Sequence, residues 1–154
     1  MTLPDIAKST QADVPALSEV AEAAGLFPGE MLPEMIAPFL AGVPGGFWLS
    51  CHLDGTAVGL SYTVPEEMAD GCWNMLALAV RPDLHGRGLG RALVAATEQE
   101  LAEQGARLVI VDTSSGDGFA GARAFYEALG YEAEARIRDF WAAGDHKITF
   151  RKML

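Results

Sequence analysis

The sequence predicts an α+β fold built on a mixed, mostly antiparallel β-sheet, and three observations support this prediction. A continuous apolar run from Met75 to Val80 leads through a glycine-rich turn into a helical pattern that stops at Gly105. Strand-like segments precede that helix, and turn signals such as Asp54-Gly55 indicate antiparallel hairpins between them. Another strand, a second helix and a pair of strands follow. This order is typical of an α+β mixed sheet.

The composition predicts one globular domain covering residues 1–154. Half of the 154 residues are apolar, which suits a chain with its own core. No apolar run reaches the length of a membrane span, and the first residues lack the apolar stretch of a signal peptide. Cys51 and Cys72 lack a C-x-x-C spacing, so we expect buried thiols in a reducing compartment, without a disulfide or a bound metal. We therefore expect a cytoplasmic protein with no membrane partner.

The net charge of −10 bears on the possible partners. Nucleic-acid backbones bind through clustered Lys and Arg, so this charge disfavours a nucleic-acid partner. It is compatible with a cationic or amine substrate.

Two helices are expected near the N-terminus, after a short edge strand at residues 6–9. Thr10-Gln11-Ala12-Asp13 resembles a capping box with Asp in place of Glu. A helical apolar stripe then runs from Val14 to Ala24 and is closed by a glycine. The second helical stretch spans Met31 to Leu40, and Pro38 is expected to end or kink it.

Three strands should follow these helices. Phe47 to Leu53 and Ala57 to Val64 form a predicted hairpin, and Pro65 ends the second strand. Cys72 to Val80 is the third strand, and its apolar second half predicts burial on both faces.

Past Gly105, Leu108 to Val111 predicts a short buried strand, parallel to Met75–Val80 if the intervening helix is a right-handed crossover. Residues 112–118 are rich in turn formers. A helix from Ala120 to Leu129 and two closing strands, Glu132–Trp141 and His146–Met153, complete the chain.

The glycine-rich turn predicts an anion site. Gly86, Gly88 and Gly90 alternate along it, and glycine allows both a tight turn and close backbone approach to a ligand. A helix that starts in such a loop presents unpaired N–H groups and a positive dipole end, which suits phosphate. Arg87 and Arg91 add positive charge to an otherwise acidic chain.

Three phosphate-binding patterns can be compared with this loop. A P-loop would need Gly-Lys-Ser/Thr, which is absent. A Rossmann turn would need a third glycine where Arg91 stands. Asp112 stands roughly where the ribose-binding acid of that fold would be, but too few residues follow Asp112 for a doubly wound sheet. His85-x-x-Gly88-x-Gly90 resembles the R/Q-x-x-G-x-G/A pattern of the GNAT superfamily of acyl-CoA-dependent N-acyltransferases, with histidine in place of glutamine or arginine.

A second segment strengthens the resemblance to the GNAT superfamily. Arg123-Ala-Phe125-Tyr126-Glu-Ala-Leu-Gly130-Tyr131 is similar to the family's A-x-x-F/L-Y-x-x-x-G-F block, and the order of elements also follows the family pattern over nearly the whole chain. The resemblance implies the GNAT fold: a mixed, mostly antiparallel sheet with a V-shaped splay between the central parallel strands, flanked by about four helices.

The resemblance also implies a binding site for the co-substrate acetyl-CoA. The backbone of Leu78, Ala79 and Val80 would hold the pantetheine arm. The pyrophosphate would lie on the glycine loop, and Phe125 and Tyr126 would also contact the co-substrate. The loop residues implied are Gly86, Arg87, Gly88, Leu89, Gly90 and Arg91.

The chemistry requires an oxyanion donor, a general acid and, for some amines, a general base. A main-chain N–H near Leu78 could serve the oxyanion. Tyr126 matches the family tyrosine that protonates the CoA sulfur. Many GNAT enzymes carry a glutamate on the strand before the loop, but Asn74 and Met75 stand there. Glu66 and Glu67 are the nearest acidic candidates. Glu30 and His52 are further alternatives.

The resemblance implies an N-acetyltransferase that acts by direct attack in a ternary complex with a primary amine of a small molecule or protein. It implies no metal, and the sequence leaves open whether the chain is a monomer or a homodimer. The missing acid on the strand that ends at Val80 favours an alternative, a non-catalytic acyl-CoA-binding or sensing module. Acetylation of tRNA is disfavoured by the charge.

Overall fold

The computed structural model describes residues 3–154 and contains a seven-stranded mixed sheet with four α-helices. The sheet has the order β1-β2-β3-β4-β5-β7-β6, and β4 and β5 form its parallel pair. The predicted α+β fold is therefore confirmed. The strands are β1 (Asp5–Lys8), β2 (Phe47–Leu53), β3 (Thr56–Pro65), β4 (Cys72–Val80), β5 (Leu108–Ser114), β6 (Glu132–Ala142) and β7 (Asp145–Met153). The helices are α1 (Val14–Ala23), α2 (Leu32–Leu40), α3 (Leu89–Glu103) and α4 (Ala120–Ala128).

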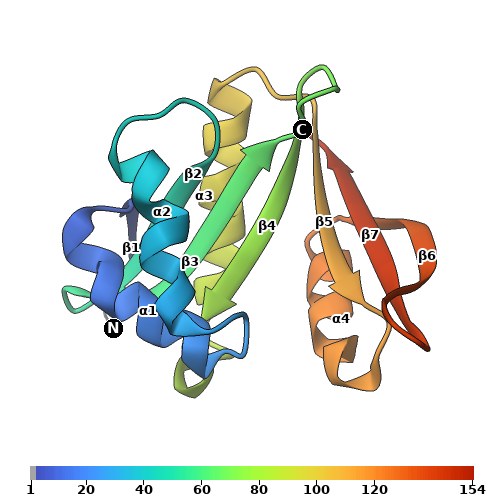
Figure 1. The fold of residues 1–154 in the computed structure, drawn as a ribbon, viewed down its shortest axis with the longest axis horizontal. Helices are drawn as coiled ribbons and strands as arrows, with labels where there is room; N and C mark the ends of the chain where they lie inside the picture. Colours follow the sequence, from blue (N-terminus) through green and yellow to red (C-terminus); the bar gives the residue numbers. More distant parts are fainter. Residues whose placement is uncertain (1–2) are drawn as a thin grey trace.

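The sheet divides into two halves that share one short seam. β4 pairs with β5 only at Cys72–Asn74, opposite Leu108–Ile110, and the two strands diverge beyond that point. Figure 1 shows the resulting V, with β1–β4 on one side and β5–β7 on the other. The expected parallel partner of β5 was Met75–Val80, and this prediction was wrong, because those residues line the open part of the V instead.

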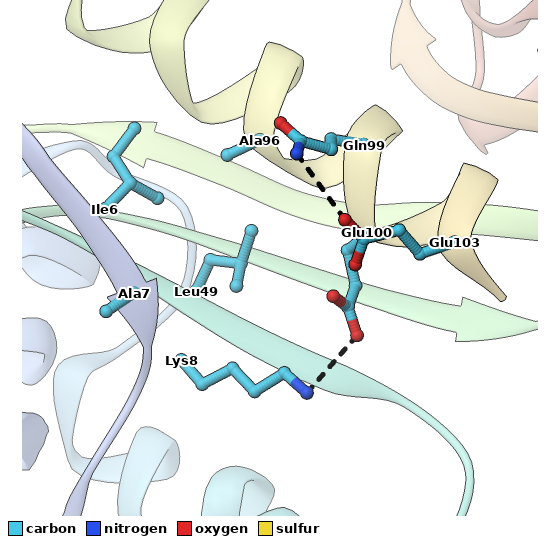
Figure 2. A pocket seen from close by; sticks show the side chains of 8 residues that line it. All are labelled: Ile6, Ala7, Lys8, Leu49, Ala96, Gln99, Glu100 and Glu103. Atoms are coloured by element: carbon cyan, nitrogen blue, oxygen red, sulfur yellow. Dashed lines mark hydrogen bonds and ion pairs between the residues drawn. The ribbon is translucent and has the colours of Figure 1, made fainter.

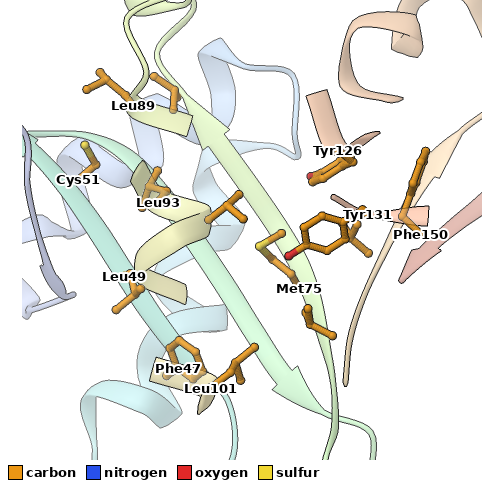
Figure 3. Packing of buried hydrophobic residues seen from close by; sticks show 14 of the residues in the cluster. Phe47, Leu49, Cys51, Met75, Leu89, Leu93, Leu101, Tyr126, Tyr131 and Phe150 are labelled. Carbon is orange, nitrogen blue, oxygen red and sulfur yellow. The ribbon is translucent and has the colours of Figure 1, made fainter. Parts of the chain in front are cut away.

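Each face of the sheet carries its own hydrophobic cluster. On one face α3 and α4 contribute Leu93, Leu101 and Tyr126, which pack with strand residues such as Val109 and Phe150 (Figure 3). On the other face α1 and α2 cover the first half only, and their cluster includes Leu17, Ile36, Trp48, Leu60 and Ala79. Among residues 3–154, the second half therefore has no helix over the face that α1 and α2 cover in the first half.

Local signals placed most element ends correctly. Gly25, Gly105 and Gly130 follow α1, α3 and α4 with φ angles of 68°, 78° and 90°, the left-handed conformation that glycine adopts without strain. Pro38 lies inside α2, which ends two residues later at Leu40.

β5 is longer than the sequence predicted. Asp112, Thr113 and Ser114 were expected in a turn-rich segment, but they extend β5 because they pair with Thr149, Ile148 and Lys147 of β7.

The surface between β1 and α3 holds a groove of about 270 Å³, shown in Figure 2. Lys8 and Glu100 meet across it, with 3.3 Å between the ammonium nitrogen and a carboxylate oxygen. None of the predicted site residues lines this groove, so we assign it no part in the proposed chemistry.

Within residues 3–154, no helix is both long enough and apolar enough to span a membrane.

Asp13 ties the start of α1 to the sheet. The predicted capping box is present, and the Thr10 N–H donates to the Asp13 carboxylate at 2.9 Å. Ser50 of β2 donates to the same carboxylate at 3.1 Å, and His52 Nε2 lies 2.7 Å from its other oxygen. Burial alone would raise the pKa of Asp13, but these hydrogen bonds and the positive charge that His52 can carry outweigh it and lower the pKa below the ordinary value.

This network predicts that acid weakens the fold through Asp13. A carboxyl group whose pKa is lower in the folded state stabilises the fold above its unfolded pKa, and this contribution disappears as the pH falls through the folded pKa. The free energy of unfolding in urea should therefore fall between about pH 5 and pH 3. Asp13→Asn should lower the free energy of unfolding by about 1.5–3 kcal/mol near neutral pH, and this free energy should then vary less with pH. Asp54→Asn, in the exposed β2–β3 turn, is the control. If its free energy of unfolding varied as little with pH as that of Asp13→Asn, the pH dependence could not be assigned to Asp13.

Candidate functional site

The glycine loop between β4 and α3 is an array of unpartnered backbone donors. Gly86 and Gly88 have φ angles of 80° and 81°, so both need the left-handed conformation. Across residues 3–154, none of the successive N–H groups from Gly86 to Arg91 has a backbone or side-chain acceptor. A Cβ built at Gly86 or Gly88 would meet no protein atom within 4 Å. The loop can therefore receive a phosphate on free N–H groups at the positive end of α3.

Charged side chains around the loop favour an anion. Arg87 and Arg91 are exposed, and neither forms a salt bridge with any residue from 3 to 154. The nearby Asp83 carboxylate is held by Arg81, with a nitrogen–oxygen distance of 2.6 Å. The side chain of His85, the departure from the family pattern, lies 3.0 Å from the Val80 carbonyl oxygen through Nε2, which must carry the proton because a carbonyl only accepts. Histidine at this position therefore anchors the loop to the end of β4.

The register of β3 against β4 decides which backbone groups point into the V. The Arg81 N–H donates to the Val58 carbonyl at 2.8 Å, which makes Arg81 and Val58 a hydrogen-bonded pair. Because such pairs alternate along an antiparallel ladder, Leu78 and Val80 belong to the other class. Their N–H and C=O groups point away from β3 and towards the gap, whereas those of Ala79 face β3. The Leu78 backbone and the Val80 N–H can therefore bind an extended ligand, whereas the Val80 carbonyl already accepts from His85, and the predicted roles of all three residues stay predictions.

A β-bulge marks the point where β4 leaves β5. The register passes from Tyr62–Ala77 to Thr63–Met75, so Leu76 is an extra residue in β4. Leu76 is 53% exposed. The prediction that Met75–Val80 is buried on both faces was therefore wrong at Leu76, because the V opens beside it. An apolar side chain at this opening can contact a bound ligand.

Tyr126 lies on the α4 side of the V, with its hydroxyl directed towards β4 (Figure 3). The residue is 7% exposed, and burial raises the pKa of its hydroxyl to about 12. Its hydroxyl makes no hydrogen bond with any other residue between 3 and 154, so it can donate to a ligand in the gap. The neighbouring Phe125 ring reaches across to the glycine loop, because a Cβ at Gly90 would lie 3.3 Å from it. Phe125 thus contacts the same loop as the predicted phosphate site.

The two glutamates predicted as bases are placed differently by the fold. Glu66 accepts a hydrogen bond from the Asn74 side-chain amide at 3.1 Å, beside the seam of the V. Asn74 alternates with Trp73 and Met75, which pack on the α3 and α4 face, so Glu66 and Asn74 lie on the opposite face. Glu67 is exposed in the following turn. Of the alternatives, His52 is held in the Asp13 network.

The sequence did not indicate Asp112 as a candidate site residue. It follows Val111, which packs beside Tyr126, so its side chain lies on the opposite face of β5, two residues beyond the seam at Ile110. Thr149 donates to its carboxylate at 2.6 Å, and Lys147 lies 4.0 Å away. A carboxylate at this position flanks the gap from the face opposite Tyr126. Because this segment read as a turn, no periodicity indicated which face of β5 Asp112 occupies.

Comparisons with known proteins agree with this geometry. The model of the Acetyltransferase (GNAT) family matches residues 16–131. An aminoglycoside N(6')-acetyltransferase type 1 of Stenotrophomonas maltophilia is 29% identical over 141 residues, which cover 87% of this chain and 90% of that protein.

Solved structures share the whole architecture. A GNAT-family protein of Desulfovibrio desulfuricans superposes with a TM-score of 0.90 at 28% identity, covering 98% of this chain and 99% of that chain. The PaiA N-acetyltransferase of Thermoplasma acidophilum, solved in complex with coenzyme A, has a TM-score of 0.74 at 17% identity, covering 99% of each chain. The second structure shows the fold alone.

Proposed function

The chain belongs to the acetyltransferase (GNAT) family, and from this premise we propose that it transfers the acetyl group of acetyl-CoA to a primary amine of a small molecule or protein. The observation that carries the proposal is the run of unpartnered N–H groups at the mouth of the V, next to the free edge of β4. This arrangement suits a long ligand with a pyrophosphate at one end and an amide-containing arm at the other.

The proposed reaction runs in one ternary complex. The neutral amine attacks the thioester carbonyl carbon, the new C–N bond forms and the C–S bond breaks. The N–H of Leu78 stabilises the oxyanion, and the Tyr126 hydroxyl donates its proton to the departing thiolate sulfur. The proton lost by the amine goes to a base or to water. Holding both reactants in line contributes much of the acceleration.

We propose that the amine approaches from the face opposite α3 and α4. The glycine loop and Tyr126 belong to the α3 and α4 side, so the free side of the thioester carbon faces the uncovered part of the sheet. Two carboxylates flank the gap there, Asp112 on β5 and Glu66 beside Asn74. Asp112 is the base candidate that the register favours, and Glu66 and Glu67 stay as the candidates from the sequence.

The acceptor class we propose is a cationic amine. The chain carries a net charge of −10, which raises the local concentration of cations. The Stenotrophomonas relative is named for an aminoglycoside, a polycationic acceptor with primary amines. Aminoglycosides are therefore the first acceptors to test, followed by polyamines and peptide N-termini.

The test of the proposed function is release of CoA from acetyl-CoA across this amine panel. We expect turnover with at least one amine, together with acetyl-CoA binding measured by calorimetry. Absence of binding at millimolar acetyl-CoA, with no rise in melting temperature, would sink the proposal, because a bound ligand must stabilise the fold by mass action. Binding without turnover on the whole panel would instead favour the sensing module, which the absence of an acid at Asn74 and Met75 supports.

Carboxamide variants separate the base candidates. Asp112→Asn should lower kcat by about 10²–10⁴-fold, the usual contribution of a general base, while the Kd for acetyl-CoA stays unchanged. Asp54→Asn, in the exposed β2–β3 turn, is the matched control, and Glu67→Gln tests the remaining candidate. A loss of kcat in Glu66→Gln, with Asp112→Asn unaffected, would move the base to Glu66.

A further inference from the structure

A cluster centred on Glu98 joins the two halves of the molecule away from the seam. Glu98 lies on α3, which packs on β1–β4 of the first half. Its carboxylate accepts a hydrogen bond from the Tyr131 hydroxyl at 2.8 Å and from the Lys152 ammonium at 3.0 and 3.2 Å. Tyr131 directly precedes β6 and Lys152 lies on β7, so both belong to the second half. Across residues 3–154, no other side-chain hydrogen bond links α3 to β5–β7 or α4.

Tyr131 connects this cluster to Tyr126. The Tyr131 N–H donates to the Tyr126 carbonyl at 3.0 Å, and the two rings meet edge-on with centroids 5.7 Å apart. Figure 3 shows the two rings side by side, facing the gap. Tyr131 is 3% exposed, and burial together with the bond to Glu98 raises the pKa of its hydroxyl, so it remains a donor at every physiological pH.

Lys152 connects the same carboxylate to the end of α4. Its ammonium also donates to the Leu129 carbonyl at 2.9 Å, just past the last residue of the helix. A cation at a helix C-terminus satisfies an unpaired carbonyl and opposes the negative dipole end. Glu98 therefore holds both the residue that packs against Tyr126 and the cation that caps the Tyr126 helix.

We propose that Glu98 is a positioning residue that, through Tyr131 and Lys152, holds α4 at a fixed distance from α3 and aims the Tyr126 hydroxyl at the thioester sulfur. The inference rests on the proposed function in one respect, because the change in kcat can be measured only if the protein transfers acetyl groups. The seam between β4 and β5 is three residue pairs long, and the glycine loop and Tyr126 belong to different halves. Without the Glu98 contacts, α3 is held to the second half, within residues 3–154, by apolar packing alone, which fixes the position of α4 less precisely than hydrogen bonds do.

The expected effect falls on turnover and not on the phosphate site. Glu98→Ala should lower kcat about ten- to hundredfold, the range that small misplacements of a reacting group produce. The Kd for acetyl-CoA should change less than about threefold, because the loop donors stay on α3 and carry the phosphate contacts. Tyr131→Phe, which keeps the ring and removes one bond, should lower kcat to a smaller extent. Glu98→Gln can still accept a hydrogen bond from Tyr131, so its kcat should lie between those of Glu98→Ala and the wild type. This variant replaces Glu98→Ala in the test if Glu98→Ala does not fold.

Glu100→Ala is a closely matched control. Glu100 lies on the same helix, has a side chain 19% exposed against 20% for Glu98, and also pairs with a lysine. That lysine, Lys8, belongs to the same half of the molecule as α3. Glu100→Ala should therefore leave kcat within about twofold of the wild type, since its loss loosens nothing between the halves.

A double-mutant cycle tests whether Glu98 acts through Tyr126. If it does, Glu98→Ala should have little further effect on kcat once Tyr126 is already Phe, because the hydroxyl it aims is gone. Fully additive losses would show that Glu98 supports the fold without positioning the acid, and would overturn the proposal.

Hydrogen exchange tests the same contacts without any amine. Amides in the last turn of α4 and at Tyr131 should exchange faster in Glu98→Ala than in Glu100→Ala. If the wild type acetylates nothing but this difference is seen, the proposed function fails and the clamping of α4 by Glu98 stands. If the wild type is active and both glutamate variants behave alike in kcat and exchange, the role of Glu98 is excluded and the function stands.

Discussion

Replacing Gly88 with glutamate is expected to abolish acetyl-CoA binding, with the Kd rising at least about a hundredfold, equivalent to about 2.7 kcal/mol. Gly88 has a φ of 81° immediately before the first residue of α3, and any Cβ there strains the backbone that aims the loop N–H groups. The protein leaves open space above it, so the new carboxylate would occupy the volume assigned to the phosphate and repel it. Titration calorimetry with acetyl-CoA measures the loss.

Gly105→Glu provides the control for strain and added charge. Gly105 has a φ of 78°, its Cβ position is equally open, and it lies beyond the other end of α3. This variant should bind acetyl-CoA like the wild type. Arg91→Ala should weaken binding more mildly than Gly88→Glu, because the amides and the helix dipole remain. An unchanged Kd in a folded Gly88→Glu protein would show that the loop is not the phosphate site.

Replacing Tyr126 with phenylalanine should lower kcat by about 10²–10⁴-fold, the usual contribution of general-acid catalysis. The ring packs with Tyr131, Phe150 and Phe125, and phenylalanine retains these contacts. Since only the hydroxyl is removed, the Kd for acetyl-CoA and the melting temperature should stay close to those of the wild type. A thiol-release assay combined with calorimetry separates the two effects.

The pH dependence adds a second test of Tyr126. With a pKa of about 12, the hydroxyl remains protonated through neutral and mildly alkaline pH, so loss of this acid should not lower kcat there. Tyr62→Phe is the control for Tyr126→Phe. Tyr62 stacks on Trp48 in the other hydrophobic cluster, so removing its hydroxyl should leave kcat unchanged. Turnover in Tyr126→Phe equal to that of the wild type would remove the assigned acid.

Much of the fold could be predicted because its signals are local. The strands Phe47–Leu53 and Cys72–Val80 begin and end where the sequence indicated, since turn formers and proline bound them. Gly88 marked the start of α3 for a comparable reason: only glycine adopts its backbone conformation without strain. The prediction of an anion site needed no tertiary information beyond this loop, because the N–H donors belong to successive residues.

The strand β5 and the sides of the gap could not be predicted in this way. Asp112, Thr113 and Ser114 favour turns, and their pairing with β7, distant in sequence, overrides that preference. The bulge at Leu76 lies just beyond the last pair of β4 with β5, and an apolar run gives no sign of a bulge.

The sequence by itself determined the α+β class, the helix and strand order, and a glycine loop suited to phosphate, because these follow from periodicity and from backbone sterics. Only the tertiary structure decided which groups face one another across the V. It directs the backbone of Leu78 into the gap and puts Asp112 on the face opposite Tyr126. It also joins Glu98 to Tyr131 and Lys152, residues 33 and 54 positions away. Such partners meet only when the sheet is assembled, so their chemistry depends on the register and twist of strands that no local pattern specifies.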